Sequence, residues 1–243
     1  MSLYLCTTKI LSLSPDILYA LFLFAATVFT YNIPRFVNSK LAGKPFGLSI
    51  LFIIPVAILV VLVLYRAQSN FNWIFSLPFV AVLFYYWPFS QRNLRTLPYL
   101  KIFTISLCWA LATVTCPLFL AREIDTFPMV TFLTIERFLF IFAITIPFDI
   151  RDMEIDRTNN LTTIPLAIGT RSALWLSTGI LVCYMSFTAY YYGPGPLLYS
   201  RIICSLFVLF LFINLKPERS SYYYTGWIDG SMILQGVLLY AFS

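Results

Sequence analysis

Long apolar stretches separated by short polar segments run through almost the whole sequence. A helix needs about 20 consecutive, mostly apolar residues to cross the hydrocarbon core of a bilayer. Eight stretches meet or approach this length: residues 16–34, 46–65, 71–88, 99–120, 128–148, 172–191, 197–214 and 226–243. They leave no room for a separate soluble domain. We therefore predict an all-α fold, a polytopic transmembrane helix bundle of eight spans that forms one domain over residues 1–243, with residues 1–14 as a half-helix too short to span.

The composition and the charge pattern agree with a membrane protein. Hydrophobic residues make up 60% of the 243 and charged residues only 11%, against about 25% charged residues in soluble domains. The net charge is +6, and eleven of the sixteen Lys and Arg residues follow the first, third, fifth and seventh predicted spans. Because Lys and Arg concentrate in cytoplasmic loops, we expect a multi-pass protein of the cell inner (plasma) membrane, embedded in the lipid bilayer, with these loops in the cytoplasm. A nucleic-acid partner is not expected, since no soluble basic surface remains for it.

Residue types that are missing or isolated exclude several classes of chemistry. The chain has no histidine, which removes haem–histidine ligation and Ser-His-Asp hydrolysis. Its five cysteines contain no C-x-x-C pair, and we predict that they are small buried hydrophobic residues. Catalysis in this chain must therefore depend on carboxylates, basic groups, hydroxyls and bound ions.

The acidic residues are concentrated in one segment after the fifth predicted span. Four of the ten lie within eight positions: Asp149, Asp152, Glu154 and Asp156. Positions 149, 152 and 156 have the i, i+3, i+7 spacing, so on a helix that continues past Pro147 the three aspartates share one face. Carboxylates this close repel one another unless a cation lies between them, and Mg²⁺ prefers such oxygen ligands and often bridges to phosphates. The pattern predicts half of a metal–diphosphate site; the open alternative is an acidic helix end that is solvated and paired with neighbouring arginines.

Two further charged residues, Glu136 and Arg137, lie inside the fifth predicted span. Ionisable side chains are costly within the membrane and usually face the interior of a bundle. Because sequence neighbours on a helix point in different directions, each of the two needs its own partner. We predict a bridge between helices at this level.

The aspartate segment resembles the second aspartate-rich motif of the UbiA superfamily of intramembrane prenyltransferases. The resemblance rests on the three aspartates and on the residues that follow them: Asn159, Asn160, Thr162, Thr163, Ile164, Pro165 and Gly169. A second stretch, residues 85–92, is similar to the Tyr, Pro and Lys-Arg signature of the same family. The resemblance implies a nine-helix fold of which this chain lacks or truncates the first helix. It also implies Asp149, Asp152 and Asp156 as Mg²⁺ ligands and catalytic residues on the cytoplasmic side.

The first aspartate-rich motif of that family has no equivalent here. It would fall near Tyr31, but no acidic residue occurs between Asp16 and Glu123. If a diphosphate still binds, basic side chains must neutralise part of its charge, and arginine does so through bidentate contacts. The predicted diphosphate contacts are the family's leading asparagine and four basic residues: Asn32, Arg35, Lys44, Arg92 and Arg95. The alternative is that the basic residues only orient the chain in the membrane.

The resemblance implies a prenyltransferase that moves a prenyl group from a polyprenyl diphosphate to a hydrophobic acceptor in the membrane, with Mg²⁺ as cofactor. The family acts on acceptors of several chemical classes, so the resemblance does not identify the acceptor. Two alternatives stay open. One is a catalytically impaired homologue that only binds an isoprenoid or lipid diphosphate, and the other is a transporter in which the intramembrane acids serve an ion pathway.

Overall fold

The computed structural model describes residues 1–28, 57, 61, 99–121, 127–158, 161–216 and 219–242. The elements in these ranges are all helical, and no strand occurs among them. In chain order they are α1 (Ser2–Ile10), α5 (Leu100–Ala110), η4 (Leu111–Thr115), α6 (Cys116–Ala121), α7 (Phe127–Arg151), α8 (Met153–Thr158), α9 (Ile164–Ile168), α10 (Thr170–Tyr192), α11 (Pro196–Ile213), η6 (Tyr223–Ile228) and α12 (Gly230–Phe242). The predicted all-α class is confirmed for this part of the chain.

Four helical segments are long and apolar enough to cross a membrane. They cover Leu100–Phe119, Pro128–Arg151, Thr170–Tyr192 and Pro196–Ile213, each within a few residues of a predicted span. A shorter apolar helix covers Ile17–Val28, and η6 with α12 occupies the last predicted span. Except for positions 57 and 61, the predicted spans 46–65 and 71–88 lie outside the described residues. A membrane protein is supported, while the count of eight spans and the single domain over 1–243 stay predictions.

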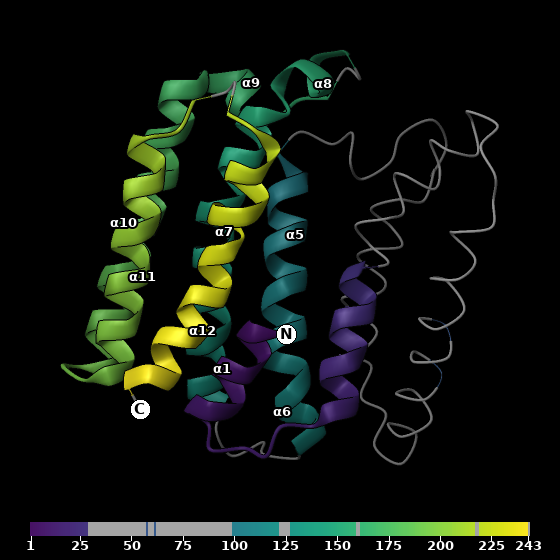
Figure 1. Ribbon diagram of the computed structural model, residues 1–243, viewed down its shortest axis with the longest axis vertical. Coiled ribbons are helices and arrows are strands. Elements are labelled where there is room, and N and C mark those ends of the chain that lie inside the picture. Colours follow the sequence, from purple (N-terminus) through teal and green to yellow (C-terminus); the bar gives the residue numbers. More distant parts are fainter. Residues whose placement is uncertain are drawn as a thin grey trace.

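Helix α7 lies at the centre of the described bundle (Figure 1). It packs against α5 and α10, and α11 packs against both α10 and α12. The short helices α8 and α9 lie across one end of the bundle, which we call the α8 end. Helix α1 lies toward the opposite end, against α12 and η4. This arrangement brings the segment after α7 and the start of α5 to the same end.

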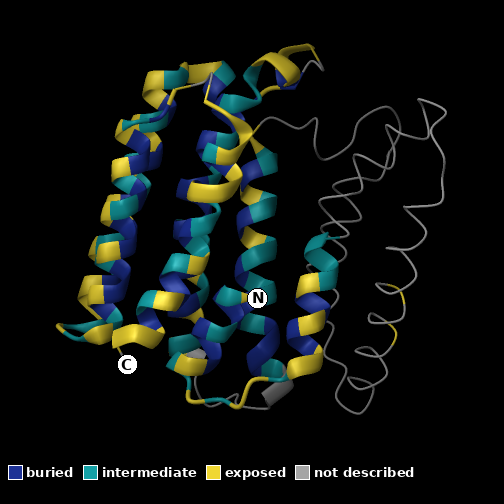
Figure 2. Ribbon diagram, in the orientation of Figure 1, coloured by how far each residue is buried: buried dark blue, intermediate teal, exposed yellow. Residues whose placement is uncertain are grey.

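Burial follows this arrangement (Figure 2). Phe140, Ile144 and Ile146 of α7 belong to one buried apolar cluster together with Leu181 of α10 and Val208 of α11. Large apolar side chains on α10 and α11 are instead exposed: Trp175, Phe210 and Ile213. Extended exposed apolar surface marks contact with a membrane or a partner. The outer faces of α10 and α11 therefore suit contact with lipid.

Helix α7 continues past Pro147, as predicted, and ends at Arg151. Proline is tolerated inside membrane helices because neighbouring groups satisfy the freed carbonyl. A turn at Asp152 separates α7 from α8. The backbone still follows a helical course there, since the amide of Asp152 donates to the carbonyl of Phe148 at 2.9 Å and the amide of Asp156 to that of Asp152 at 2.8 Å. Asp149 and Asp156 are thus placed about two turns apart along a nearly continuous helix.

Helix α1 is held closely against α12. A Cβ atom at Gly236 would collide with Oγ of Ser2, and that hydroxyl donates to the carbonyl of Met232 at 3.1 Å. The hydroxyl of Tyr240 lies 3.5 Å from the carbonyl of Leu5. The segment predicted as a half-helix is therefore a short helix that packs within the bundle.

Candidate active site

Three charged side chains from three helices meet at the α8 end. Asp149 lies in the last turn of α7, Asp156 lies in α8, and Lys101 lies in the first turn of α5. The Nζ of Lys101 is 2.6 Å from Oδ1 of Asp149 and 3.4 Å from Oδ2 of Asp156. One ammonium group therefore joins two carboxylates that are seven residues apart in sequence.

Both of these carboxylates are withdrawn from water. Each aspartate side chain is 1% exposed, and that of Lys101 is 15% exposed. Removing one partner of a buried ion pair leaves an uncompensated charge, at a cost of about 3–5 kcal/mol. Two buried carboxylates that converge on one positive group thus define a position at which the fold requires a cation.

Asp152 faces a different partner. Its Oδ1 accepts a hydrogen bond from Nε of Arg151 at 2.7 Å, and its Oδ2 accepts one from Nη2 at 3.0 Å. The same guanidinium lies 5.2 Å from the ring centroid of Phe148 and 5.3 Å from that of Tyr224. The predicted single face of three aspartates is therefore divided, with Asp149 and Asp156 on Lys101 and Asp152 on Arg151.

The donor chemistry of this end suits a hard cation only in part. Within the described ranges, no group of three or more His, Cys, Asp or Glu side chains is arranged to hold a metal ion. Asp149 and Asp156 do supply carboxylate oxygens that converge on a positive group, and Mg²⁺ prefers such oxygens. The pair fits a cation, and a third protein ligand would require Asp152 to leave Arg151. The assignment of Asp149, Asp152 and Asp156 to Mg²⁺ stays a prediction.

The segment between α8 and α9 connects the aspartate helix to α5. The amide of Leu161 donates to the carbonyl of Asp156 at 2.9 Å, and the amide of Tyr99 donates to that of Thr162 at 3.2 Å. Thr163 precedes α9 and is buried, and its Oγ1 has no hydrogen-bond partner among the described residues. This segment fixes the start of α5, and with it Lys101, beside the aspartates.

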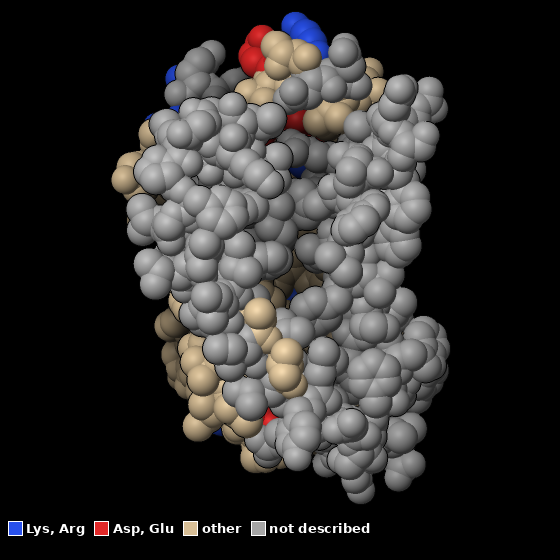
Figure 3. Space-filling view, turned by 90° about the vertical axis from the view of Figure 1, so that its right-hand side faces the viewer, with Lys and Arg blue, Asp and Glu red and all other residues tan. Residues whose placement is uncertain are grey.

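Charged side chains gather around this end of the molecule. Figure 3 shows the face that lies to the right in Figure 1, and acidic and basic side chains are grouped at its α8 end. Glu154 and Arg157 of α8 are exposed, whereas Asp156 between them is buried. Exposed charged side chains of α8 therefore lie next to the buried Asp156 in sequence, which suits an end of the bundle that faces water.

The predicted diphosphate contacts cannot be placed. Asn32, Arg35, Lys44, Arg92 and Arg95 lie outside the described residues, as does the stretch 85–92 of the resemblance, and all stay predictions. The sequence did not single out Lys101 as a residue of the candidate site, because the positive-inside rule already accounts for it as one of the cytoplasmic basic residues. Its position just inside an apolar span was the available signal, since an ammonium there needs a partner.

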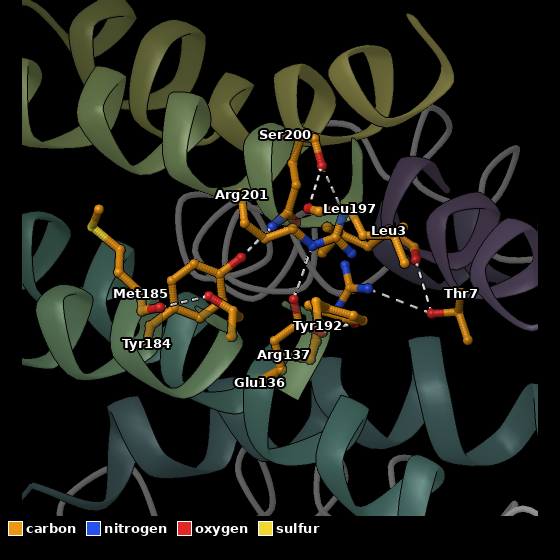
Figure 4. Close-up of polar contacts among 12 residues, drawn as sticks. Leu3, Thr7, Glu136, Arg137, Tyr184, Met185, Tyr192, Leu197, Ser200 and Arg201 are labelled. Atoms are coloured by element: carbon orange, nitrogen blue, oxygen red, sulfur yellow. Dashed lines mark hydrogen bonds and ion pairs between the residues drawn. The ribbon is translucent and has the colours of Figure 1, made fainter. Parts of the chain in front are cut away.

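A second buried polar cluster lies deeper along α7 (Figure 4). Oε1 of Glu136 accepts a hydrogen bond from Nε of Arg201 in α11 at 3.0 Å, and its Oε2 accepts one from the hydroxyl of Tyr192 in α10 at 3.1 Å. Arg137 points elsewhere, and its Nη2 donates to Oγ1 of Thr7 in α1 at 3.4 Å. The predicted bridge between helices is present: the cluster ties α7 to α1, α10 and α11.

Comparison with known proteins identifies the fold. No protein-family model matches the sequence, and no curated protein matches it. The structure is similar to a solved structure of digeranylgeranylglyceryl phosphate synthase, with a TM-score of 0.58 and 18% sequence identity, over 99% of this chain and 89% of that one. The chain thus shares the fold of that synthase, which agrees with the architecture implied by the resemblance of the aspartate segment.

Proposed function

We propose that this protein transfers a prenyl group from a polyprenyl diphosphate to a hydrophobic acceptor within the membrane. The observation that carries the proposal is the buried pair of Asp149 and Asp156, joined by one cationic group, at the end of a bundle with a prenyltransferase fold. Buried carboxylates that require a positive partner suit a site that handles a cation and a polyanion together.

In this proposal Asp149, Asp152 and Asp156 are the catalytic residues and hold Mg²⁺. Bound Mg²⁺ supplies charge neutralisation for the departing diphosphate. The basic residues outside the described ranges contact the phosphates together with an asparagine: Asn32, Arg35, Lys44, Arg92 and Arg95. Lys101 is well placed to donate hydrogen bonds to a phosphate oxygen, because its ammonium already lies between the two carboxylates.

Aromatic rings below the aspartates support the handling of a carbocation. Phe103 of α5 lies 4.8 Å from Phe142 and 6.1 Å from Phe138 between ring centroids. Phe142 is seven residues before Asp149, which corresponds to about 10 Å along the helix. Ring faces attract positive charge, and apolar walls keep water away from a reactive intermediate. When the carbon–oxygen bond of an allylic diphosphate breaks, the cationic carbon would lie between the carboxylate level and these rings.

The location follows from the charge pattern of the sequence. We infer a multi-pass protein of the plasma membrane with the α8 end in the cytoplasm, because the predicted loops on that side carry eleven of the sixteen basic residues. The long apolar helices are consistent with such a location. The diphosphate headgroup of the donor would then face the cytoplasm, while its prenyl tail and the acceptor lie in the bilayer.

Replacement of Asp149 by Asn tests the proposed activity. We expect the purified wild-type protein in detergent to release diphosphate from an allylic prenyl diphosphate only with Mg²⁺ and an acceptor extract. Asp149→Asn should lower this rate by about a hundredfold, since charge stabilisation in an active site is worth this much. Diphosphate release over time is the measurement. Glu154→Gln, an exposed acid of the same segment, is the matched control and should keep the wild-type rate.

A second candidate function has an observation of its own in its favour. No acidic residue lies between Asp16 and Glu123, so the other half of the family's metal site is missing from this segment, and Lys101 lies where a cation is required. These features suit a homologue that binds isoprenoid diphosphate without turnover. Saturable binding of a prenyl diphosphate with no release, across donors of different length and with Mg²⁺ present, would establish this function and end the enzymatic proposal.

A further inference from the structure

We infer that Lys101 is a resident counter-ion of the aspartate site and that it makes Mg²⁺ binding dependent on the diphosphate. The inference rests on the proposed function and concerns the regulation of that site. The position between Asp149 and Asp156 has two possible occupants, the ammonium of Lys101 and a divalent cation. The ammonium of Lys101 contacts Asp149 at 2.6 Å and Asp156 at 3.4 Å, and these are two of the three carboxylates predicted to bind Mg²⁺.

An ammonium group and a divalent cation cannot share this position. Like charges separated by a few ångströms repel, and the repulsion grows as the surroundings become less polar. Both carboxylates are 1% exposed, so solvent does little to screen the interaction. Without a diphosphate, a divalent ion must compete with a cation that is covalently attached to the fold.

Asp152, the third predicted metal ligand, also has a positive partner from the chain itself. Asp152 accepts two hydrogen bonds from Arg151, and the rings of Phe148 and Tyr224 hold that guanidinium. A metal ion arriving alone would therefore find two carboxylates already in contact with the Lys101 ammonium and the third paired with Arg151. Each aspartate that this segment offers already has a positive partner from the chain itself.

A diphosphate changes this balance because it brings several negative charges to the same end. An ammonium on a flexible four-carbon chain can turn from a carboxylate to a phosphate oxygen, which it binds as a point charge. The carboxylates then lose their counter-ion and become free to ligate a divalent ion. The expected order is that diphosphate and metal bind together, and that the metal alone binds weakly.

Binding of Mn²⁺, used as a spectroscopic probe for Mg²⁺, tests the inference on the full-length protein in detergent. Electron paramagnetic resonance measures free Mn²⁺ in wild type, Lys101→Met and Lys101→Arg, with and without pyrophosphate, after subtraction of Mn²⁺ bound by pyrophosphate alone. We expect Lys101→Met to bind Mn²⁺ without pyrophosphate about tenfold more tightly than wild type, because it lacks the competing charge. Lys101→Arg keeps that charge and should resemble wild type. Lys9→Met, at the opposite end of the bundle, is the control for loss of a lysine and should also resemble wild type.

Lys101→Met could be poorly folded, because its buried carboxylates lose their partner. Thermal unfolding with and without Mn²⁺ then tests the inference. Mn²⁺ should then restore the stability of Lys101→Met and leave that of wild type unchanged. Equal Mn²⁺ affinity of wild type and Lys101→Met, or a variant that Mn²⁺ does not rescue, overturns the inference. The assay of diphosphate release decides separately on the proposed function, because an active wild type with equal Mn²⁺ affinities would remove only the role of Lys101.

Discussion

In the part of the chain that the structure describes, Glu136 is the only acid in a buried cluster that holds two arginines. Its carboxylate accepts hydrogen bonds from Arg201 and Tyr192, while Nη1 of Arg137 and Nη2 of Arg201 have no hydrogen-bond partner among the described residues. Both guanidinium groups are almost completely buried. The stability of this part of the bundle therefore depends strongly on one negative charge.

Replacement of Glu136 by Gln should destabilise the protein by about 3–5 kcal/mol, because the amide keeps the shape but leaves Arg201 buried without a counter-charge. Thermal unfolding in detergent is the measurement. The double variant Glu136→Gln with Arg201→Gln should lose less stability than the sum of the two single variants, since removal of both charges avoids the unpaired state. Strictly additive losses would show that the pair does not interact.

Among single residues, the acids of this chain are easier to recognise from the sequence than their basic partners. Asp149, Asp152 and Asp156 stand out because acids are rare in this chain, and Glu136 because it lies within an apolar span. Lys101 did not stand out, since the positive-inside rule already explains basic residues at a cytoplasmic membrane boundary. Which base meets which acid depends on the packing of distant helices, and one sequence carries no such information.

At the scale of helices, the contact between α1 and α12 depends on the absence of a side chain at Gly236. Alanine is favoured over glycine within a helix by about 1 kcal/mol. At Gly236 this gain is opposed, because the new Cβ would displace the Ser2 hydroxyl from the carbonyl of Met232. Nothing lies within 4 Å of a Cβ at Gly179 in α10, so replacement of Gly179 by alanine should show only the gain in helix propensity.

We expect Gly179→Ala to raise the thermal stability and Gly236→Ala to bring no gain or a loss. Adding Ser2→Ala to Gly236→Ala should recover stability, since the remaining neighbours, Cβ of Ser2 at 3.6 Å and Sγ of Cys6 at 3.5 Å, lie at ordinary contact distance. Unfolding temperatures of the four proteins give the comparison. A gain at Gly236 equal to that at Gly179 would mean that α1 does not pack closely there.

Helix positions were predictable because apolar length and polar interruptions determine where a membrane helix can run. The predicted spans 128–148 and 172–191 became α7, Phe127–Arg151, and α10, Thr170–Tyr192. The interruptions within helices were not predictable in the same way. The π-helical segments η4 and η6 and the turn at Asp152 follow from how neighbouring helices pack, and hydropathy does not record such packing.

At the scale of the whole molecule, the two ends of the bundle are chemically different. The α8 end carries Lys101, Asp149 and Asp156, whereas the turn between α10 and α11, residues 193–195, lies at the opposite end (Figure 1). The number of spans and the placement of the predicted phosphate-binding residues concern segments beyond the described ranges.

Cysteine accessibility in intact cells measures the orientation in the membrane. With Cys183, the exposed native cysteine, replaced by serine, Glu154→Cys should react with a membrane-impermeant maleimide only after the membrane is opened. Pro194→Cys should react in intact cells, because the two exposed positions lie at opposite ends of the bundle. The reverse pattern would place the aspartates outside the cytoplasm and contradict the proposed location. Reaction of both positions in intact cells would contradict the transmembrane arrangement itself.

A long apolar stretch of α7 separates its two groups of charged residues, Glu136 with Arg137 on one side and Asp149 on the other. Between Arg137 and Asp149 the helix advances about 18 Å, and its residues 138–148 include a single hydroxyl, that of Thr145, which bonds to the carbonyl of Ile141 in its own helix. Within this stretch the side chains of α7 include no ionisable group, and a hydroxyl from α10, that of Ser177, donates to the carbonyl of Ala143 at 2.6 Å. Helix α7 itself thus offers no chain of ionisable groups between its two charged levels, and its apolar side chains there suit the prenyl tail of the proposed donor.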